Sequence, residues 1–140
     1  MSEVTAIIVA AGEGRRFGFS KQFALLGGKS VLDRSLEMFE AHKKVEAIVL
    51  VLNGVGLKKE YLKRYRKIVG VAKGGKRRQD SVFSGFRQID PEKAEIVLVH
   101  DGVRSLVSED LIDRVIEATR EAGAAVPAIP VEDTIKLVEG

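Results

Sequence analysis

The sequence predicts an α/β fold, a three-layer Rossmann-like domain with a mostly parallel sheet. Short runs rich in Val and Ile alternate along the chain with longer segments of helical periodicity. The short runs carry no polar face, which is typical of strands covered by helices on both sides. With 140 residues, 45% of them hydrophobic, the chain can bury a core of its own. We therefore expect residues 1–140 to form a single domain.

The predicted elements alternate between strand and helix. Strands are expected at 4–10, 46–52, 67–72, 95–100 and 124–131. Helices are expected at 30–44, 57–67, 80–89 and 108–123. Ser30 and Ser108 stand where the residue that caps a helix N-terminus belongs, and Gly123 where a helix ends. Alternation of strands and helices implies right-handed crossovers and a parallel sheet, with helices over both of its faces.

The composition excludes several classes of protein. A chain without cysteine forms no disulfide, no zinc–thiolate site and no cysteine nucleophile. No stretch approaches the roughly 18 apolar residues of a membrane span, and the first residues lack the pattern of a secretory signal. We expect a cytoplasmic protein that has no membrane partner.

Positive charge is concentrated in one part of the chain. The net charge is +3, yet residues 58–78 hold ten Lys and Arg against a single acidic residue, Glu60. Apolar residues recur in this part at helical spacing: Leu57, Tyr61, Leu62 and Tyr65. The pattern favours a solvated helix face over a nucleic-acid interface, because no nucleic-acid-binding motif accompanies the charge.

Loops that follow strands are the candidate sites, because ligands of such sheets bind beyond the carboxyl ends of the strands. Four of these loops carry unusual chemistry: "AGEGRRFGFSKQ" (11–22), "KGGKRRQDS" (73–81), "HDGVRS" (100–105) and "EDTIK" (132–136). The loop after the second strand, "NGVG" (53–56), shows no such chemistry.

The first loop does not match the two common nucleotide-binding motifs. A dinucleotide fingerprint requires a glycine where Phe17 stands and an acidic residue where Asn53 follows the second strand. A P-loop requires Ser or Thr after its lysine, whereas Lys21 precedes Gln22. These departures argue against a dinucleotide-dependent oxidoreductase.

The chemistry that remains in the first loop suits a polyphosphate. Gly12 and Gly14 allow backbone N–H groups to approach an anion. Arg15, Arg16 and Lys21 add positive charge beside them. Taken alone, the loop is also compatible with a tight, solvated turn.

The loops after the third and fourth strands have related features. Gly75 precedes three cations, and Asp80 opens the next helix, where it serves equally well as a helix cap. Asp101 follows the fourth strand, where a carboxylate can orient a hydroxyl group or hold a metal ion. The alternative is that Asp101 braces its loop by pairing with Arg104. His100 is better explained as a hydrogen-bonded structural residue than as a base.

Five motifs together resemble one known family: "AAGEGRRF", "SKQF", "GGKRRQDSV", "VLVHDGVR" and "GAAVPAIPVEDTIK". In order and spacing they are similar to those of the 2-C-methyl-D-erythritol 4-phosphate cytidylyltransferases. The ribitol-5-phosphate cytidylyltransferases are near relatives, but their glycine loop more often reads AGG. The resemblance implies a sheet of nucleotidyltransferase type and transfer of CMP from CTP to methylerythritol phosphate, with release of pyrophosphate. A non-catalytic CTP-binding module is the alternative.

The resemblance also implies roles for individual residues. Arg16 and Lys21 would stabilise the transition state. Residues expected to bind the nucleotide are Ala10, Ala11, Gly12, Gly14, Gly75, Asp80 and Ser81. Residues expected to bind the acceptor substrate are Asp101, Arg104 and Thr134. Family members use Mg²⁺ on the triphosphate and form homodimers through an arm, which we expect to begin near residue 131 and to be cut short here.

Overall fold

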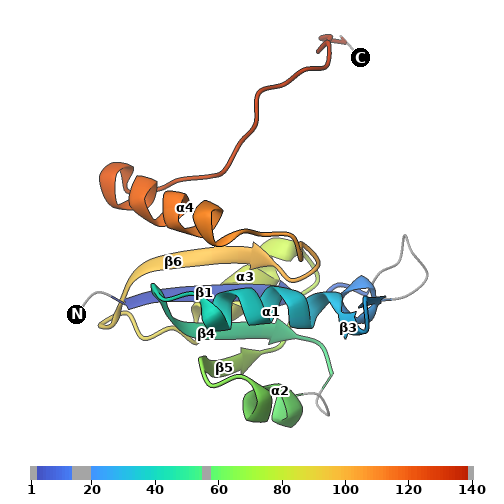
Figure 1. Ribbon diagram of the computed structural model, residues 1–140, viewed down its shortest axis with the longest axis vertical. Coiled ribbons are helices and arrows are strands. Elements are labelled where there is room, and N and C mark those ends of the chain that lie inside the picture. Colours follow the sequence, from blue (N-terminus) through green and yellow to red (C-terminus); the bar gives the residue numbers. More distant parts are fainter. Residues whose placement is uncertain (1–2, 14–19, 55–57, 139–140) are drawn as a thin grey trace.

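The computed structural model describes residues 3–13, 20–54 and 58–138. Its centre is a four-stranded parallel sheet in the order β5-β4-β1-β6 (Figure 1). The strands are β1 (Glu3–Ala10), β4 (Val45–Leu52), β5 (Ile68–Ala72) and β6 (Ala94–Asp101). Each of the first four predicted strands is therefore confirmed to within one residue at either end.

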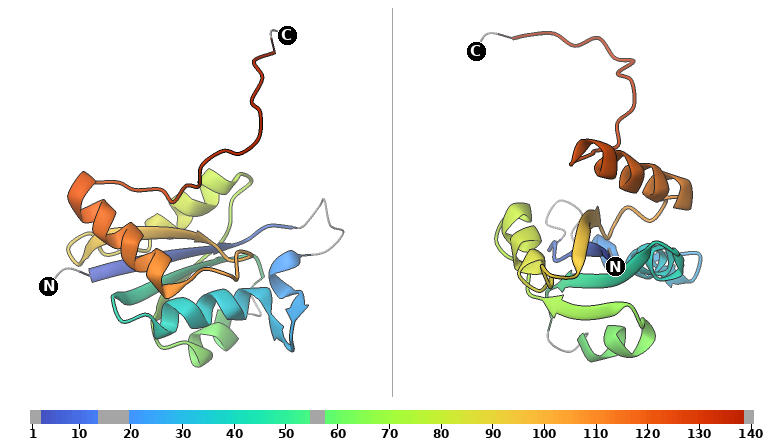
Figure 2. Two further views of the ribbon diagram at one scale, coloured as in Figure 1. Left: turned by 45° about the horizontal axis from the view of Figure 1, so that its top comes forward. Right: turned by 90° about the vertical axis from the view of Figure 1, so that its left-hand side faces the viewer.

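Helices cover both faces of the sheet, as the sequence predicts. They are α1 (Val31–Ala41), α2 (Lys58–Arg64), α3 (Arg78–Phe86) and α4 (Glu109–Ala122). Figure 2 shows α3 on one face and the other three helices on the opposite face. Buried side chains of α1, α2 and α4 join one cluster with the sheet, whereas a smaller cluster of Ile7, Ala11, Val51 and Ala72 lies on the face toward α3. The three-layer α/β class is confirmed.

The helix ends follow the predicted caps. The Asp33 amide donates to the Ser30 hydroxyl at 3.0 Å, and the Leu111 amide donates to the Ser108 hydroxyl at 3.2 Å. Gly123 ends α4 with a φ of +83°, which is the left-handed conformation that favours glycine. Other bounds differ by one to three residues; α3, for example, begins at Arg78 and not at Asp80.

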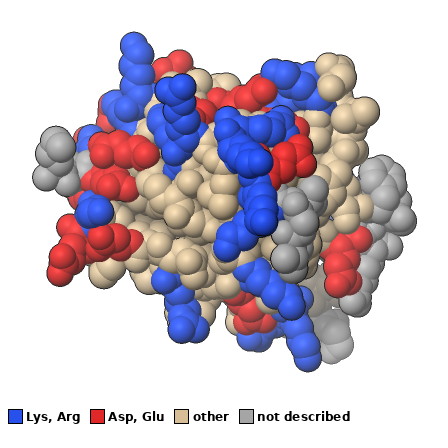
Figure 3. Space-filling model, turned by 90° about the horizontal axis from the view of Figure 1, so that it is seen from below, with Lys and Arg blue, Asp and Glu red and all other residues tan. Residues whose placement is uncertain are grey.

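The amphipathic helix predicted in the basic region is α2. Tyr61 and Tyr65 are buried, and the lysines of the helix are exposed. Seen from this side of the molecule, Lys and Arg side chains cover much of the surface, with acidic side chains between them (Figure 3). Leu62, predicted on the apolar face, is 39% exposed, so that part of the prediction is wrong, and Leu57 lies outside the described residues.

The fifth predicted strand is absent. Residues 124–138 leave the end of α4 as an extended segment that runs away from the body of the domain (Figure 1). Val126 and Ile129 are 87% and 88% exposed there. Apolar composition makes a strand only where another strand accepts its hydrogen bonds, and Pro127 and Pro130 each remove a backbone donor. The prediction of a strand at 124–131 is therefore wrong for this structure.

A small hairpin that the sequence analysis did not predict precedes α1. Its strands are β2 (Leu25–Leu26) and β3 (Lys29–Ser30). Gly27 and Gly28 form the turn with φ values of +60° and +80°. A Gly-Gly pair between two short strands is a known signal for this turn, because both central residues require positive φ. The hairpin leads the chain from the first loop back to the start of α1.

Among the helices of the described residues, none is long and apolar enough to cross a lipid bilayer.

The close packing of α3 on the sheet leads to a stability prediction. A Cβ on Gly85 would lie 2.7 Å from Cγ2 of Ile7 and 2.8 Å from Cγ2 of Val51, both in the sheet. We expect Gly85→Val to lower the free energy of unfolding by about 1–3 kcal/mol, because it overpacks this contact. Urea unfolding measures the change. Gln79→Ala, an exposed change in the same helix, is the control and should stay within about 0.5 kcal/mol of the wild type. Equal stability of the two variants would contradict this packing.

Candidate functional site

The described parts of three candidate loops, those after β1, β5 and β6, lie at the edge of the sheet where the strands end. The chain runs from β1 outward to β4 and β5 and then crosses back to β6 on the other side of β1. Ligands of doubly wound sheets bind at such a reversal of strand order. Gly102, after β6, donates its amide to the Val9 carbonyl at 2.8 Å, and the Ser35 hydroxyl of α1 donates to the Gly102 carbonyl at 2.9 Å. The loop after β6 is thereby held against β1 and α1.

Two side-chain amides hold the start of the first loop. Gln22, in the short helix η1 (Lys21–Phe23), donates from Nε2 to the carbonyls of Ala10 at 3.0 Å and Gly12 at 2.9 Å. Asn53, which follows β4, donates from Nδ2 to the Ala11 carbonyl at 2.7 Å. Three consecutive carbonyls are therefore fixed. Because the C=O and N–H of one planar trans peptide point in opposite directions, the amides that follow these carbonyls are also fixed in direction.

The loop after β5 packs directly on this first loop. The Gly74 amide donates to Oδ1 of Asn53 at 3.2 Å, and a Cβ on Gly74 would overlap the Ala11 methyl group. The Gly75 amide donates to the buried hydroxyl of Ser81 at 3.0 Å. The structure therefore brings together four residues that are predicted to bind the nucleotide: Ala10, Ala11, Gly75 and Ser81.

Asp80 lies in the first turn of α3. Its carboxylate accepts a hydrogen bond from the Arg77 amide at 3.1 Å and forms an ion pair with the Arg77 guanidinium at 2.9 Å. The hydrogen bond from the Arg77 side chain, followed by that from its backbone, lowers the pKa of Asp80. Because Arg77 is the N-cap and Asp80 is the third residue of the helix, the interpretation of Asp80 as the N-cap is wrong, although its carboxylate does bond to the N-cap amide. A contact of Asp80 with a nucleotide stays a prediction.

Asp101 joins the loops after β5 and β6. Its Oδ1 atom accepts from the guanidinium of Arg78 at 2.9 Å and its Oδ2 atom from Arg104 at 3.2 Å. The bracing interaction between Asp101 and Arg104 is thus present, and Arg78 is a second partner that the sequence analysis missed. His100 places Nε2 2.9 Å from the Arg104 carbonyl, and burial lowers the pKa of His100. Both features support a structural role for this histidine.

The remaining predicted site residues have different outcomes. Lys21 is exposed at the first position of η1. Gly14 and Arg16 lie outside the described residues. Thr134 was expected beside Asp101, but it lies in the extended segment after α4, which carries it away from the sheet edge (Figure 1). A role of Thr134 in binding the acceptor therefore stays a prediction.

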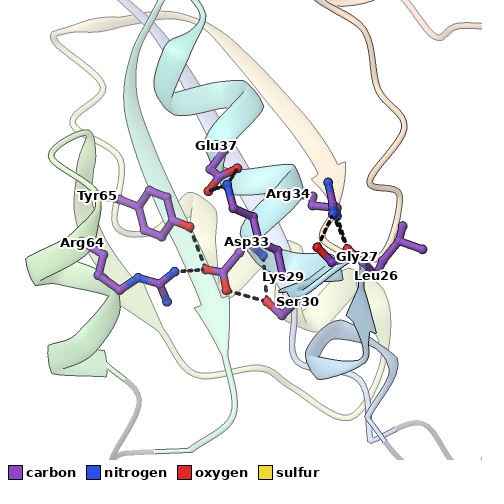
Figure 4. A network of polar contacts seen from close by, with 9 residues as sticks. All are labelled: Leu26, Gly27, Lys29, Ser30, Asp33, Arg34, Glu37, Arg64 and Tyr65. Atoms are coloured by element: carbon purple, nitrogen blue, oxygen red, sulfur yellow. Dashed lines mark hydrogen bonds and ion pairs between the residues drawn. The ribbon is translucent and has the colours of Figure 1, made fainter.

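A buried polar network supports the N-terminus of α1 (Figure 4). The carboxylate of Asp33 accepts from the Tyr65 hydroxyl and from the Ser30 hydroxyl, each at 2.7 Å, and pairs with Arg64 at 2.9 Å. Burial raises the pKa of Asp33, but the hydrogen bonds from Tyr65 and Ser30 and the charge of Arg64 together outweigh it and lower the pKa. Burial raises the pKa of Tyr61 beside this network to about 12. The network ties α2 to the helix that starts at the site.

The described residues contain no group of three or more His, Cys, Asp or Glu side chains placed to hold a metal ion. Two carboxylates at this edge, Asp80 and Asp101, are each paired with arginine.

The fold and the converging glycine loops define a doubly wound α/β domain with a candidate nucleotide site at its carboxyl edge. This chain belongs to the 2-C-methyl-D-erythritol 4-phosphate cytidylyltransferase family, whose model matches residues 4–140. The family resemblance and the nucleotidyltransferase type of the fold are thereby confirmed.

Individual relatives agree with this assignment. A 2-C-methyl-D-erythritol 4-phosphate cytidylyltransferase from Alkaliphilus metalliredigens is 41% identical over 98% of this chain and 59% of its own length. A bifunctional enzyme IspD/IspF from Desulforudis audaxviator is 43% identical over 98% of this chain and 36% of its own. The crystal structure of 4-diphosphocytidyl-2C-methyl-D-erythritol synthase from Anaerococcus prevotii aligns with a TM-score of 0.85 at 32% identity, over 99% of this chain and 60% of its own. The chain thus spans about 60% of the length of single-function relatives.

The lowered pKa of Asp33 leads to a prediction of pH dependence. A carboxyl whose pKa is lowered on folding contributes stability above its unfolded value of 3.8, and that contribution is lost as the pH falls through the lower folded value. We expect Asp33→Asn to reduce the free energy of unfolding by about 1–3 kcal/mol at neutral pH and by less in acid. Urea unfolding at several pH values measures this.

Asp133→Asn, in the exposed extended segment, is the matched control and should behave as the wild type at each pH. A loss of stability in Asp33→Asn that is the same in acid as at neutral pH would contradict the charged network.

Proposed function

We propose that this chain forms the nucleotide-binding part of a cytidylyltransferase that transfers CMP from CTP to 2-C-methyl-D-erythritol 4-phosphate and releases pyrophosphate. The observation that carries the proposal is the junction of the first loop with the loop after β5, where Gly74 packs on Ala11 and Asn53 bonds to both loops. Such a junction sets two glycine loops side by side at the sheet edge, where the backbone of the first loop can approach the phosphates of a nucleoside triphosphate.

The reaction needs no general base. The acceptor is a phosphate monoester whose second pKa is about 6, so that it is largely a dianion at neutral pH. One of its oxygens attacks the α-phosphorus of CTP and forms a new P–O bond, while the bond from the α-phosphorus to the bridging oxygen breaks and pyrophosphate leaves. The barrier is the repulsion between two anions and the charge that grows on the phosphoryl oxygens, which positioned cations offset.

The resemblance to the family implies roles for individual residues. Ala10, Ala11, Gly12 and Gly14 would approach the phosphates, and Gly75, Asp80 and Ser81 the cytosine and ribose. Arg16 and Lys21 would stabilise the transition state. Asp101 would accept a hydrogen bond from an acceptor hydroxyl while Arg104 braces its loop, and Thr134 would join them from the segment after α4.

We further propose Mg²⁺ as the cofactor, carried mainly by the CTP phosphates, where it neutralises charge on the leaving pyrophosphate. The full-length protein is proposed to be a cytoplasmic homodimer with no nucleic-acid or membrane partner. The exposed Val126, Ile129, Ile135 and Leu137 support an arm that packs on another subunit, because apolar side chains in such number are seldom left in water.

The test is release of pyrophosphate by the full-length polypeptide supplied with CTP, Mg²⁺ and one acceptor at a time. We expect release with 2-C-methyl-D-erythritol 4-phosphate and little with ribitol 5-phosphate. The reverse preference would identify the ribitol phosphate enzyme, and CTP binding without release would identify a non-catalytic module.

The role of Lys21 can be tested by removing its charge. We expect Lys21→Ala, in the full-length polypeptide, to lower kcat by at least about a hundredfold with a modest change in the KM for CTP, because the charge acts mainly on the transition state. Lys29→Ala is the control, since Lys29 is an exposed lysine that pairs with Glu37. An unchanged kcat in Lys21→Ala would contradict the role; Arg16→Ala is expected to behave as Lys21→Ala does.

The role of Asp101 can be tested through the acceptor. We expect Asp101→Asn to raise the KM for the acceptor about tenfold while the KM for CTP changes little, because the substitution weakens an acceptor for a substrate hydroxyl. Asp110→Asn in the exposed first turn of α4 is the control. A defect confined to CTP would show that Asp101 serves the nucleotide.

A further inference from the structure

We propose that Asn53 is a positioning residue that couples the two glycine loops, so that a nucleotide spanning both of them finds them already aligned. The proposal rests on the proposed function, because it assigns the phosphates to the first loop and the nucleoside to the loop after β5. Asn53 lies on the loop 53–56, in which the sequence analysis found no functional chemistry.

The geometry of Asn53 is that of a two-ended link. Its Nδ2 donor bonds to the Ala11 carbonyl at 2.7 Å, and its Oδ1 acceptor receives the Gly74 amide at 3.2 Å. The side chain is half-buried at the end of β4, the strand that lies between β1 and β5. One rigid strand therefore positions both loops through a single amide, which has a donor for one partner and an acceptor for the other.

The packing around Asn53 leaves little freedom at the junction. A Cβ on Gly74 would meet the Ala11 methyl group, Oδ1 of Asn53 at 3.2 Å and the Ser81 hydroxyl at 3.2 Å. Gly75 in turn donates to that same hydroxyl. The two loops thus share one set of contacts, and the relative position of their backbones depends on the amide that bonds to both.

Pre-alignment of the loops affects the affinity of a ligand according to whether the ligand touches one loop or both. A ligand that touches one loop needs only that loop ordered, whereas a ligand that touches both also bears the entropic cost of fixing one loop relative to the other. Asn53 lowers that second cost. Removal of the Asn53 side chain is therefore expected to weaken the binding of CTP more than the binding of pyrophosphate or cytidine, each of which contacts a single loop.

The first measurement is binding to this chain by titration calorimetry. We expect Asn53→Ala to lower the affinity for CTP with Mg²⁺ at least about tenfold, and the affinities for pyrophosphate and for cytidine each by less than about threefold. Gln88→Ala, which removes an exposed side-chain amide beyond α3, is the control and should leave all three affinities unchanged. Equal weakening of the three ligands, or no weakening of CTP, would overturn the proposal.

The second measurement needs no ligand. Hydrogen exchange at the Gly74 amide, followed by NMR, is expected to be about fivefold faster in Asn53→Ala and close to wild type in Asn53→Asp, which keeps an acceptor for that amide but loses the donor to Ala11. Unchanged exchange in Asn53→Ala would overturn the coupling. Should Asn53→Ala fail to fold, Asn53→Ser replaces it, because its hydroxyl is too short to bridge the two loops.

The two measurements separate this proposal from the proposed function. A wild-type chain that binds no CTP would contradict the nucleotide site itself, and the exchange at Gly74 would still decide whether Asn53 joins the loops. A full-length protein that releases pyrophosphate at the wild-type rate with Asn53→Ala, and with unchanged CTP affinity, would leave the function standing and remove Asn53 from it.

Discussion

The site depends on the close approach of two backbones, at Ala11 and Gly74, on neighbouring loops at the sheet edge. No side chain fits on Gly74, because its Cβ would occupy the space of the Ala11 methyl group. Ala11 is itself 7% exposed, so it cannot move outward to make room without losing its place in the core. Parallel strands bring the two loops to the same edge, and the small residues then let them meet.

Once the backbones meet, side-chain amides replace water as partners of the loop carbonyls. Gln22 and Asn53 carry no net charge. Their amide groups donate hydrogen bonds to carbonyl oxygens that would otherwise face an incoming anion. The carboxylates at the same edge are neutralised in a related way, Asp80 by Arg77 and Asp101 by Arg78 and Arg104. Pairing of these two carboxylates lowers the repulsion that would oppose a polyanion at this edge.

Much of the frame follows from the sequence, and the reasons differ from element to element. Short, unbroken apolar runs located β1, β4, β5 and β6, because strands that are covered on both faces have no polar face. The apolar segment 124–131 carries the same signal but has no strand beside it in this structure, and pairing is a property of the neighbour that local composition does not contain. The prediction for Leu62 is wrong because α2 is short: Tyr61 in the helix and Tyr65 just after it are buried, whereas Leu62 is exposed.

Within the site, sequence reasoning found the residues whose type is unusual and missed those whose type is ordinary. Glycine, paired arginines and a carboxylate at a strand end stand out because each has few structural reasons to be there. An asparagine after a strand has many, so Asn53 carried no signal until its two partners, 42 and 21 residues away in sequence, were seen on either side of it. Only the fold brings a donor at one loop and an acceptor at another within reach of one amide. The position of Asn53 is thus a consequence of strand order, since β4 is the strand that separates β1 from β5.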